Sequence, residues 1–246
     1  MKARRVGPLA AIVLVPSALL YLLHFLLFRD PQNVGFYTLM DLAFLPVQAI
    51  LVSAVLEAFL ARREAAARAR KLGMVSGAFF SEVGDGLVAA LSARDAALAA
   101  RKEALAVGPS WRRRDFEEAA RASRALGSAL ALEPGDFPAL AAYLSARRDF
   151  LLGLLENPLV LDHEGLTEAL MAVFHAHDEL RQRRDFDILP PSDLAHLRGD
   201  LERAYGDLLE SRLLYLGALK ASYPFLYSLA LRSDPLEPGR EPLVAG

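Results

Sequence analysis

Four side chains between residues 164 and 179 have the chemistry and spacing of metal ligands. Glu164, Glu168, His175 and Glu179 recur at helical intervals, so an α-helix would carry them on one side. Carboxylates and imidazoles that project from facing helices bind metal ions in helical bundles. Such sites usually take Glu-x-x-His pairs from the facing helices, and the sequence contains none. We therefore interpret the four residues as a solvated polar face, and we expect neither a metal ion nor another cofactor.

Three other histidines lie close to these residues. His177 falls on the apolar face of the same segment, where a hydrogen-bonded core histidine is a simpler interpretation than a metal ligand. His163 and His196 lie near expected helix starts, and we expect both to be exposed.

A second group of polar residues, His24, Asp41 and Gln48, lies inside long apolar segments. Ionisable groups are costly in hydrocarbon, so they pair with one another or mark a functional site. Counting from the turn between the segments places His24 and Asp41 at about the same depth, which predicts an ion pair or hydrogen bond between them. In the alternatives, each group reaches separately to the membrane interface, or Asp41 and Gln48 face the pore of an oligomeric channel.

The sequence lacks the motifs of several enzyme classes. It contains no phosphate-binding P-loop, no G-x-S-x-G turn and no H-E-x-x-H helix. It has no cysteine, which excludes disulfides and thiolate catalysis. Carboxylates outnumber basic side chains after residue 71, which argues against nucleic-acid binding. An enzyme is therefore the least favoured class of function.

Two long apolar segments carry the polar groups near the N-terminus. Residues 6–28 contain no charged side chain, and residues 36–60 contain only Asp41 and Glu57. At about 1.5 Å per residue, a helix of either length would cross a hydrocarbon layer of about 30 Å. The polar stretch 29–35 between them suits a turn, so residues 1–60 are predicted to form a transmembrane hairpin. A cleaved signal peptide is the alternative, but its apolar core would be shorter and would end at small residues.

The basic residues beside these segments predict the orientation. Lysine and arginine next to a span are held on the cytoplasmic side, and they precede the first segment and follow the second. The linker 61–73 contributes Arg62, Arg63, Arg68, Arg70 and Lys71. Both termini are therefore expected in the cytoplasm. We interpret the linker as an anchor beside anionic headgroups rather than as a specific lipid site.

The rest of the chain has the apolar periodicity of amphipathic helices. The fold is predicted to be all-α, with the hairpin followed by a cytoplasmic bundle of four to five helices over residues 74–232. The tail 233–246 is rich in proline and glycine, and we expect it to be disordered. The expected helices run from Met74 to Leu105, from Ser110 or a capping Asp115 to Glu133, from a capping Asp136 to Glu156, from Asp162 to Arg184, and from a capping Ser192 to Pro224, which should kink or end the last one.

Four segments of the chain resemble a known group of proteins. They are DLAFLPVQ (Asp41–Gln48), LGMVSGAFFSEVG (Leu72–Gly84), LLENPLVLDHEGLTEALMAVFH (Leu154–His175) and YPFLYSLALRSDP (Tyr223–Pro235). They are similar to segments of uncharacterised bacterial and archaeal integral membrane proteins. The resemblance implies a two-span protein of a prokaryotic inner membrane with a helical cytoplasmic domain. It implies no catalytic residue, because the group has no established activity.

Three classes of function follow from these patterns. The favoured one is a membrane-anchored interaction or scaffold protein, in which the hairpin holds the helical domain at the lipid bilayer. Its cytoplasmic helices would bind a protein partner or a second copy of the chain. A subunit of a small oligomeric channel or transporter is the alternative, supported by Asp41 and Gln48. A membrane-bound enzyme comes last.

Overall fold

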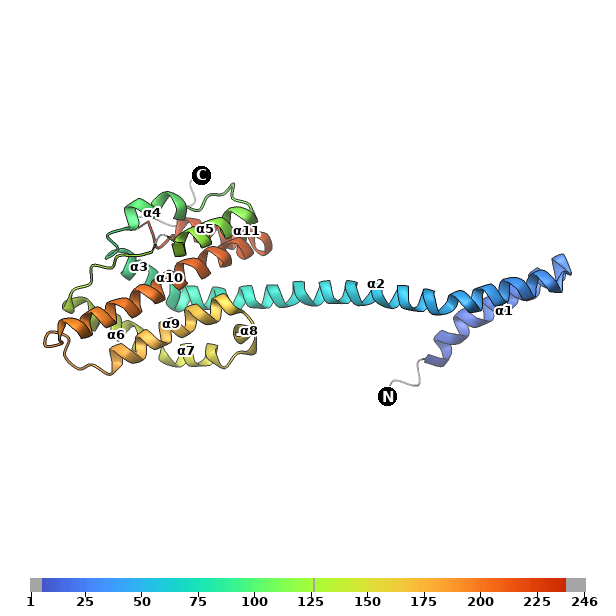
Figure 1. The fold of residues 1–246 in the computed structure, drawn as a ribbon, viewed down its shortest axis with the longest axis horizontal. Helices are drawn as coiled ribbons and strands as arrows, with labels where there is room; N and C mark the ends of the chain where they lie inside the picture. Colours follow the sequence, from blue (N-terminus) through green and yellow to red (C-terminus); the bar gives the residue numbers. More distant parts are fainter. Residues whose placement is uncertain (1–5, 126, 238–246) are drawn as a thin grey trace. The chain divides into compact units, whose positions relative to one another are not determined.

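The computed structural model describes the backbone of residues 6–125 and 127–237 and shows an all-α protein (Figure 1). Side chains are described from residue 14 onward within these ranges, that of residue 104 excepted. The chain forms two compact units, Met1–Glu64 and Ala65–Gly246. The described residues contain no strand, only an isolated bridge between Asp95 and Leu130. The predicted all-α class is confirmed.

The first unit pairs helix α1 (Val6–Phe28) with the beginning of helix α2 (Pro31–Phe79). The turn between them is tight because Arg29 adopts a left-handed conformation, with φ of 48°. Asp30 then caps α2, since its carboxylate accepts a hydrogen bond from the backbone N–H of Gln32 at 3.1 Å. The turn is shorter than the polar stretch that predicted it, because proline fits the first turn of a helix.

Apolar side chains cover the outside of this unit. Between Leu14 and Leu60, all the large apolar side chains except the half-buried Val34 are 41% to 71% exposed, the extremes being Tyr21 and Ile50. A soluble monomer rarely leaves so continuous an apolar surface uncovered. This unit therefore has no apolar core of its own among the residues whose side chains are described.

The structure supports one of the two predicted spans, 6–28 and 36–60. Among the described residues, one helical stretch, Pro31–Ser92, is long and apolar enough to cross a membrane by length and composition. In α1, the apolar stretch with described side chains is Leu14–Phe28, which is shorter than the roughly 20 residues of a typical span. The prediction of a two-span hairpin is not supported by this criterion.

The second unit is built around α10 (Pro191–Ser222) (Figure 1). Helix α10 packs against α9 (Glu164–Arg181), α5 (Arg113–Ala125), α11 (Pro224–Arg232) and α3 (Asp85–Ser92). It buries Leu197, Leu201 and Leu208 in the core, at the spacing that the sequence predicted. The other elements are the end of α2, a π-helical turn (Phe80–Gly84), α4 (Leu98–Leu105), a 3₁₀ turn (Pro134–Asp136), α6 (Phe137–Ser145), α7 (Arg148–Leu155) and α8 (Pro158–Leu161).

The helix expected over residues 74–105 is interrupted at residues 93–97. The chain turns there, and Asp95 accepts a hydrogen bond at 3.2 Å from the N–H of Ala129, which lies 34 residues further on. Asp95 also forms an ion pair with Arg101, and the two side chains are 0% and 2% exposed. Apolar periodicity did not reveal this break, because it is stabilised by polar groups, and one of them, the N–H of Ala129, lies in a distant part of the chain.

Two predicted helix caps are wrong. Helix α5 begins before Asp115, whose carboxylate instead reaches back to the N–H of Arg112 at 2.6 Å. Helix α10 begins before Ser192, with proline at its first position. Asp136 is the N-cap residue of α6, as predicted, but its carboxylate accepts a hydrogen bond from Glu133 N–H at 2.9 Å in the 3₁₀ turn and none from α6.

Other helix boundaries also differ from the predictions. Helix α5 ends well before Glu133, and Gly127 follows it with a left-handed φ of 62°, which glycine adopts without strain. The expected third helix divides into α6 and α7 at Ala146 and Arg147. Helix α2 continues through Gly73, beyond the end of the linker predicted over residues 61–73. Pro224 ends α10 and starts α11, as predicted.

The tail expected to be disordered begins with an ordered segment, 233–237. Asp234 is buried, and its Oδ1 lies 3.3 Å from Nη1 of Arg212 on α10. Arg212 is also buried, and its Nε donates a hydrogen bond to Oδ1 of Asp85 on α3 at 2.8 Å. One arginine therefore fastens this segment and α3 to α10. Residues 238–246 lie outside the described residues.

Candidate functional site

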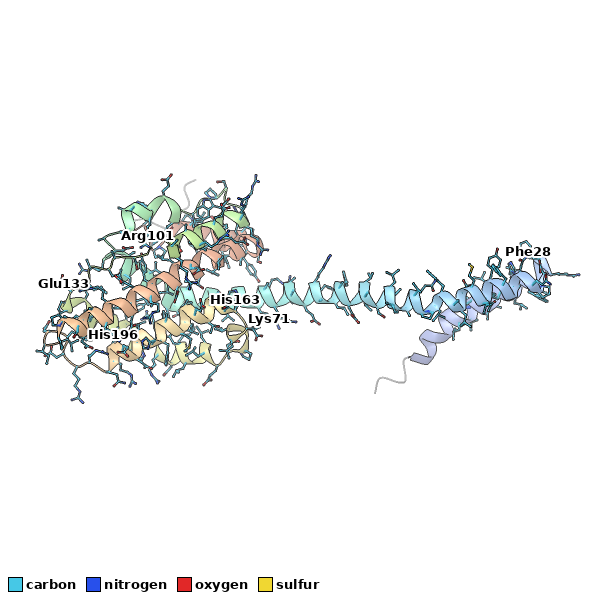
Figure 2. All side chains as sticks on the ribbon, in the orientation of Figure 1. Phe28, Lys71, Arg101, Glu133, His163 and His196 are labelled. Carbon is cyan, nitrogen blue, oxygen red and sulfur yellow. The ribbon has the colours of Figure 1, made fainter. Side chains whose placement is uncertain are left out.

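Helices α9 and α10 lie side by side and run in opposite directions, joined by residues 182–190 (Figure 1). In an antiparallel pair, a step of four residues along one helix matches four residues back along the other. His175 therefore lies opposite Asp200, and Glu179 lies opposite His196. His196, labelled in Figure 2, comes from the second turn of α10. These four residues are called the α9–α10 cluster below.

Asp200 is central to the α9–α10 cluster. Its Oδ2 lies 3.3 Å from Nε2 of His175 and 3.3 Å from Nε2 of His196. Nε2 of His196 lies 3.7 Å from Oε2 of Glu179. The donor atoms of Glu179, His196 and Asp200 all lie within 4.8 Å of one another. Two imidazoles and two carboxylates are thus gathered between two helices, which is the donor set of many zinc, iron and manganese sites.

The α9–α10 cluster is open on one side. The side chains of His175 and His196 are 47% and 53% exposed, and that of Asp200 is 3% exposed. A buried carboxylate oxygen normally accepts a hydrogen bond, yet Oδ2 of Asp200 accepts none. Both imidazole nitrogens are near enough to donate to it, and neither is aligned to do so. The buried side of the cluster therefore holds a carboxylate oxygen whose bonding capacity is unused.

Two arginines hold the carboxylates of the α9–α10 cluster. Nη1 of Arg183 donates a hydrogen bond to Oε2 of Glu179 at 2.5 Å. The same guanidinium binds both carboxylate oxygens of Asp193 at 2.7 and 2.9 Å, and this hydrogen bonding lowers the pKa of Asp193. Nη1 of Arg203 lies 3.2 Å from Oδ1 of Asp200, the oxygen that faces away from the histidines. Both carboxylates are thus oriented from outside the cluster.

The structure brings together only part of the predicted ligand set. His175 and Glu179 belong to the α9–α10 cluster, but Glu164 and Glu168 lie further back along α9 and are not part of it. Glu168 instead lies 3.3 Å from the guanidinium of Arg124 on α5. His175 and Glu179 thus face charged side chains of α10 as well as solvent.

The two cluster residues on the facing helix, His196 and Asp200, do not follow the Glu-x-x-His pattern expected of such sites. The cluster uses a different pattern, a histidine followed four residues later by a carboxylate, once on each helix. The pattern occurs as His175 with Glu179 and as His196 with Asp200. Two such pairs on consecutive antiparallel helices are the signal that would have found the cluster.

The remaining histidines lie apart from the cluster's donor atoms. His177 is fully buried, as predicted, but both ring nitrogens lack a hydrogen-bond partner, although Nδ1 lies 3.2 Å from Oδ1 of Asp178. Burial lowers the pKa of His177 because the charged imidazolium would lose its hydration. His163, labelled in Figure 2, is half-buried and caps α9, accepting a hydrogen bond at Nδ1 from the N–H of Leu166 at 3.2 Å.

The polar residues of the apolar unit are paired differently from the prediction. Asp41 accepts a hydrogen bond at 2.8 Å from the hydroxyl of Tyr21, not from His24. The ring of His24 lies 4.9 Å from that of Phe28, on its own helix. Asp41 and Gln48 line a common cavity of about 520 Å³ with Tyr21, whereas His24 lies at a separate one. The helix register places a tyrosine opposite the carboxylate, one turn from the predicted partner.

The basic residues of the predicted linker all lie on helix α2. Arg62, Arg63, Arg68, Arg70 and Lys71 are exposed, and Lys71 is labelled in Figure 2. Arg63 lies over the ring of Phe59, with its guanidinium carbon 5.6 Å from the ring centroid. The linker is helical because alanine and arginine are strong helix formers, so these charges lie around one continuous α-helix.

Comparison with known proteins gives two family matches and one curated relative. Residues 68–232 match "Uncharacterized protein MJ1433, C-terminal helical domain", and residues 6–60 match "MJ1433, N-terminal helical domain". "Uncharacterized protein MJ1433" of Methanocaldococcus jannaschii is 39% identical over 221 residues, which cover 90% of this chain and 89% of the relative. The chain belongs to the MJ1433 family. No solved structure matches the chain.

The two MJ1433 domains divide the candidate sites between them. The C-terminal helical domain contains the α9–α10 cluster, and the N-terminal helical domain contains the pair formed by Tyr21 and Asp41. The resemblance to an uncharacterised archaeal group is confirmed, while the membrane character expected from that resemblance does not appear in the family's description. Membership of the MJ1433 family assigns helical domains and no activity.

Proposed function

We propose that this protein is a membrane-anchored helical interaction module. In this proposal α1 and the first part of α2 form a two-span hairpin in the cell membrane, and the second unit is a cytoplasmic domain that binds a protein partner. The observation that carries the proposal is the apolar surface of the first unit, where the large apolar side chains from Leu14 to Leu60, Val34 excepted, remain 41% to 71% exposed.

Lipid is the covering that best suits this surface. The exposed apolar side chains lie all around both helices, whereas a docking face for another protein would form a stripe on one side. Helix α1 has 23 residues and no charged side chain, so at about 1.5 Å per residue it measures about 35 Å. That length spans a hydrocarbon core of about 30 Å, as does the apolar beginning of α2.

The hydrogen bond within the hairpin supports the same proposal. A carboxylate inside hydrocarbon requires a donor, and Tyr21 provides one to Asp41 at 2.8 Å. The bond joins α1 to α2, so it also sets the register of the two helices. Such a bond is worth about 1 kcal/mol in a membrane, which is enough to favour one register.

The basic residues of α2 support a cytoplasmic location for the second unit. Lysine and arginine beside a span remain on the cytoplasmic side, and five of them follow Leu60 within a short stretch. The N-terminal residues Lys2, Arg4 and Arg5 lie outside the described residues, but their charges in the sequence favour the same side. The proposal therefore places both termini in the cytoplasm of a prokaryotic inner membrane.

The charged pairs inside the second unit favour a binding role over catalysis. Arg101 pairs with Asp95 across the turn between α3 and α4, and Arg212 joins α10 to Asp85 on α3 and to Asp234, so both arginines connect separate elements of the domain. These groups maintain the domain's shape. A rigid helical domain with a membrane anchor is the architecture of a protein that recruits or positions a partner.

A second candidate function is a small oligomeric channel. The cavity of about 520 Å³ beside Asp41 also contains Thr38 and Gln48, which would give a polar lining if several hairpins associated. The Tyr21 bond weighs against it, because it already satisfies the carboxylate within one hairpin. Conductance of purified protein in liposomes, abolished by Asp41→Leu, would favour the channel over the interaction module.

Labelling of single cysteines tests the proposed topology. The chain has no cysteine, so each substitution introduces one unambiguous thiol. Gln32→Cys lies at the turn of the hairpin and should react with a membrane-impermeant reagent in intact cells. Ser110→Cys and Ser233→Cys lie on exposed positions of the second unit and should react only after the membrane is opened.

The unsubstituted chain is the control for this experiment, because it has no thiol to label. Labelling of Ser110→Cys in intact cells would place the second unit outside and refute the orientation. Release of the protein from membranes by alkaline carbonate would refute the spans themselves, since a hairpin that crosses the bilayer resists this extraction.

A further inference from the structure

We propose that the α9–α10 cluster is a binding site for one divalent transition-metal ion, with Zn²⁺ as the best fit. His175 and Glu179 would be the ligands from α9, and His196 and Asp200 those from α10. This inference is independent of the membrane anchor, because all four residues lie within the second unit.

The donor atoms of Glu179, His196 and Asp200 lie within 4.8 Å of one another, and His175 approaches this group through Asp200. For metal–ligand bonds of about 2.0–2.1 Å, the donors of a tetrahedral ion lie about 3.3–3.4 Å apart. Oδ2 of Asp200 lies 3.3 Å from both histidine Nε2 atoms, and Oε2 of Glu179 lies 3.7 Å from that of His196. A small cation would therefore bind Glu179, His196 and Asp200 first, and the half-exposed side chain of His175 would turn toward it as the fourth ligand.

The unused oxygen of Asp200 is the second observation that points to a cation. Only 3% of this side chain is exposed, and its Oδ2 faces two imidazole nitrogens without accepting a hydrogen bond. A buried carboxylate oxygen without a donor destabilises the folded state, because it has lost its hydration without replacement. A metal ion between this oxygen and the two nitrogens would satisfy all three groups together.

The composition of the cluster selects the class of ion. Two carboxylates neutralise one divalent cation, and two imidazoles favour zinc or a neighbouring transition metal over magnesium or calcium, which prefer oxygen. The hydrogen bond from Arg183 to Glu179 and the contact of Arg203 with Asp200 supply the outer partners that orient ligating carboxylates. The exposed sides of the two histidines leave the ion accessible to water.

A bound ion would join α9 to α10 near the loop 182–190. The Arg183–Asp193 pair already closes this end of the helix pair, with bonds of 2.7 and 2.9 Å. The metal would add a second connection between the two helices close to that loop. Binding should therefore stabilise the folded domain. Stability that depends on metal concentration is therefore an expected consequence.

The test uses full-length protein in detergent, stripped of metal with a chelator and titrated with Zn²⁺ alone. We expect one ion per chain and a rise in the thermal midpoint with Zn²⁺ concentration. Co²⁺ should bind in its place and give the visible absorption of a cobalt ion with nitrogen and oxygen ligands. His175→Ala and His196→Ala should each weaken Zn²⁺ binding at least about tenfold, since each removes a ligand.

The two histidine variants suit the test because their side chains are half-exposed, so replacing them should not unfold the domain. Glu164→Gln is the matched control, because this carboxylate lies on the same helix but outside the cluster, and its Zn²⁺ affinity should equal that of the unsubstituted protein. The proposal is overturned if no stoichiometric Zn²⁺ binding occurs, or if His175→Ala and His196→Ala bind as tightly as Glu164→Gln.

Discussion

Replacement of Arg101 by methionine should destabilise the second unit strongly. The side chains of Arg101 and Asp95 are 2% and 0% exposed and form an ion pair. Asp95 also accepts hydrogen bonds from the backbone N–H groups of Ala97 and Ala129 at 3.0 and 3.2 Å, so it stays in place when the arginine is removed. Methionine keeps the length of the aliphatic stem but removes the positive charge. The carboxylate then remains buried without its counter-charge.

The expected cost is about 3–5 kcal/mol, the usual effect of breaking a buried ion pair by removing one partner. For a domain of this size, each kcal/mol lowers the thermal midpoint by about 2–4 °C, so the shift should be about 6–20 °C. Asp95→Asn combined with Arg101→Met should recover part of the loss, because the double variant contains no uncompensated charge. A coupling of about 1–3 kcal/mol is expected between the two positions.

Tryptophan fluorescence provides a selective assay. The chain has one tryptophan, Trp111, which belongs to the second unit and lies 5.1 Å from the ring of Phe116. Its emission therefore reports the unfolding of this unit in full-length protein, without a signal from the hairpin. Arg114→Met is the control, since its ion pair with Glu118 is largely exposed and should leave the midpoint unchanged. Equal midpoints for Arg101→Met and Arg114→Met would refute the role assigned to the buried pair.

Two further predictions concern a histidine and the hairpin. Because burial lowers the pKa of His177, the unfolded state binds the proton first, so the domain should lose stability as the pH falls below about 6.5. His177→Leu should flatten the pH dependence of the free energy of unfolding, followed by Trp111 fluorescence, by up to about 1.4 kcal/mol per pH unit. An unchanged slope would contradict the assignment. In the hairpin, Tyr21→Phe and Asp41→Asn should be non-additive in resistance to unfolding by dodecyl sulfate, with a coupling of about 1 kcal/mol, whereas His24→Leu and Asp41→Asn should be additive.

The sequence predicted the helical class and much of the core because both depend on local periodicity. Leu197, Leu201 and Leu208 recur at helical spacing, and any fold that buries α10 must bury them together. Pro224 also ended its helix as predicted, since the restriction is local to the proline and the preceding turn. The break at residues 93–97 could not be predicted this way, because Ala129 and Arg101 stabilise it from elsewhere in the chain.

The same distinction applies to the candidate sites. The sequence placed Asp41 within an apolar segment, but the identity of its partner depended on the register of α1 against α2, and one turn of helix changed it from His24 to Tyr21. Such a register depends on the packing of two helices and on the geometry of the turn at Arg29. Counting residues from an assumed turn cannot determine it.

The sequence by itself determined that Glu164, Glu168, His175 and Glu179 share one side of a helix, because the helical repeat relates positions three or four apart. Only the tertiary structure decided that His196 and Asp200 face the last two across an antiparallel pair, and that Glu164 and Glu168 do not take part. The physical reason is that a coordination shell requires donor atoms a few ångströms apart in three dimensions. One helix can supply two of them, and the packing of a second helix must bring the others.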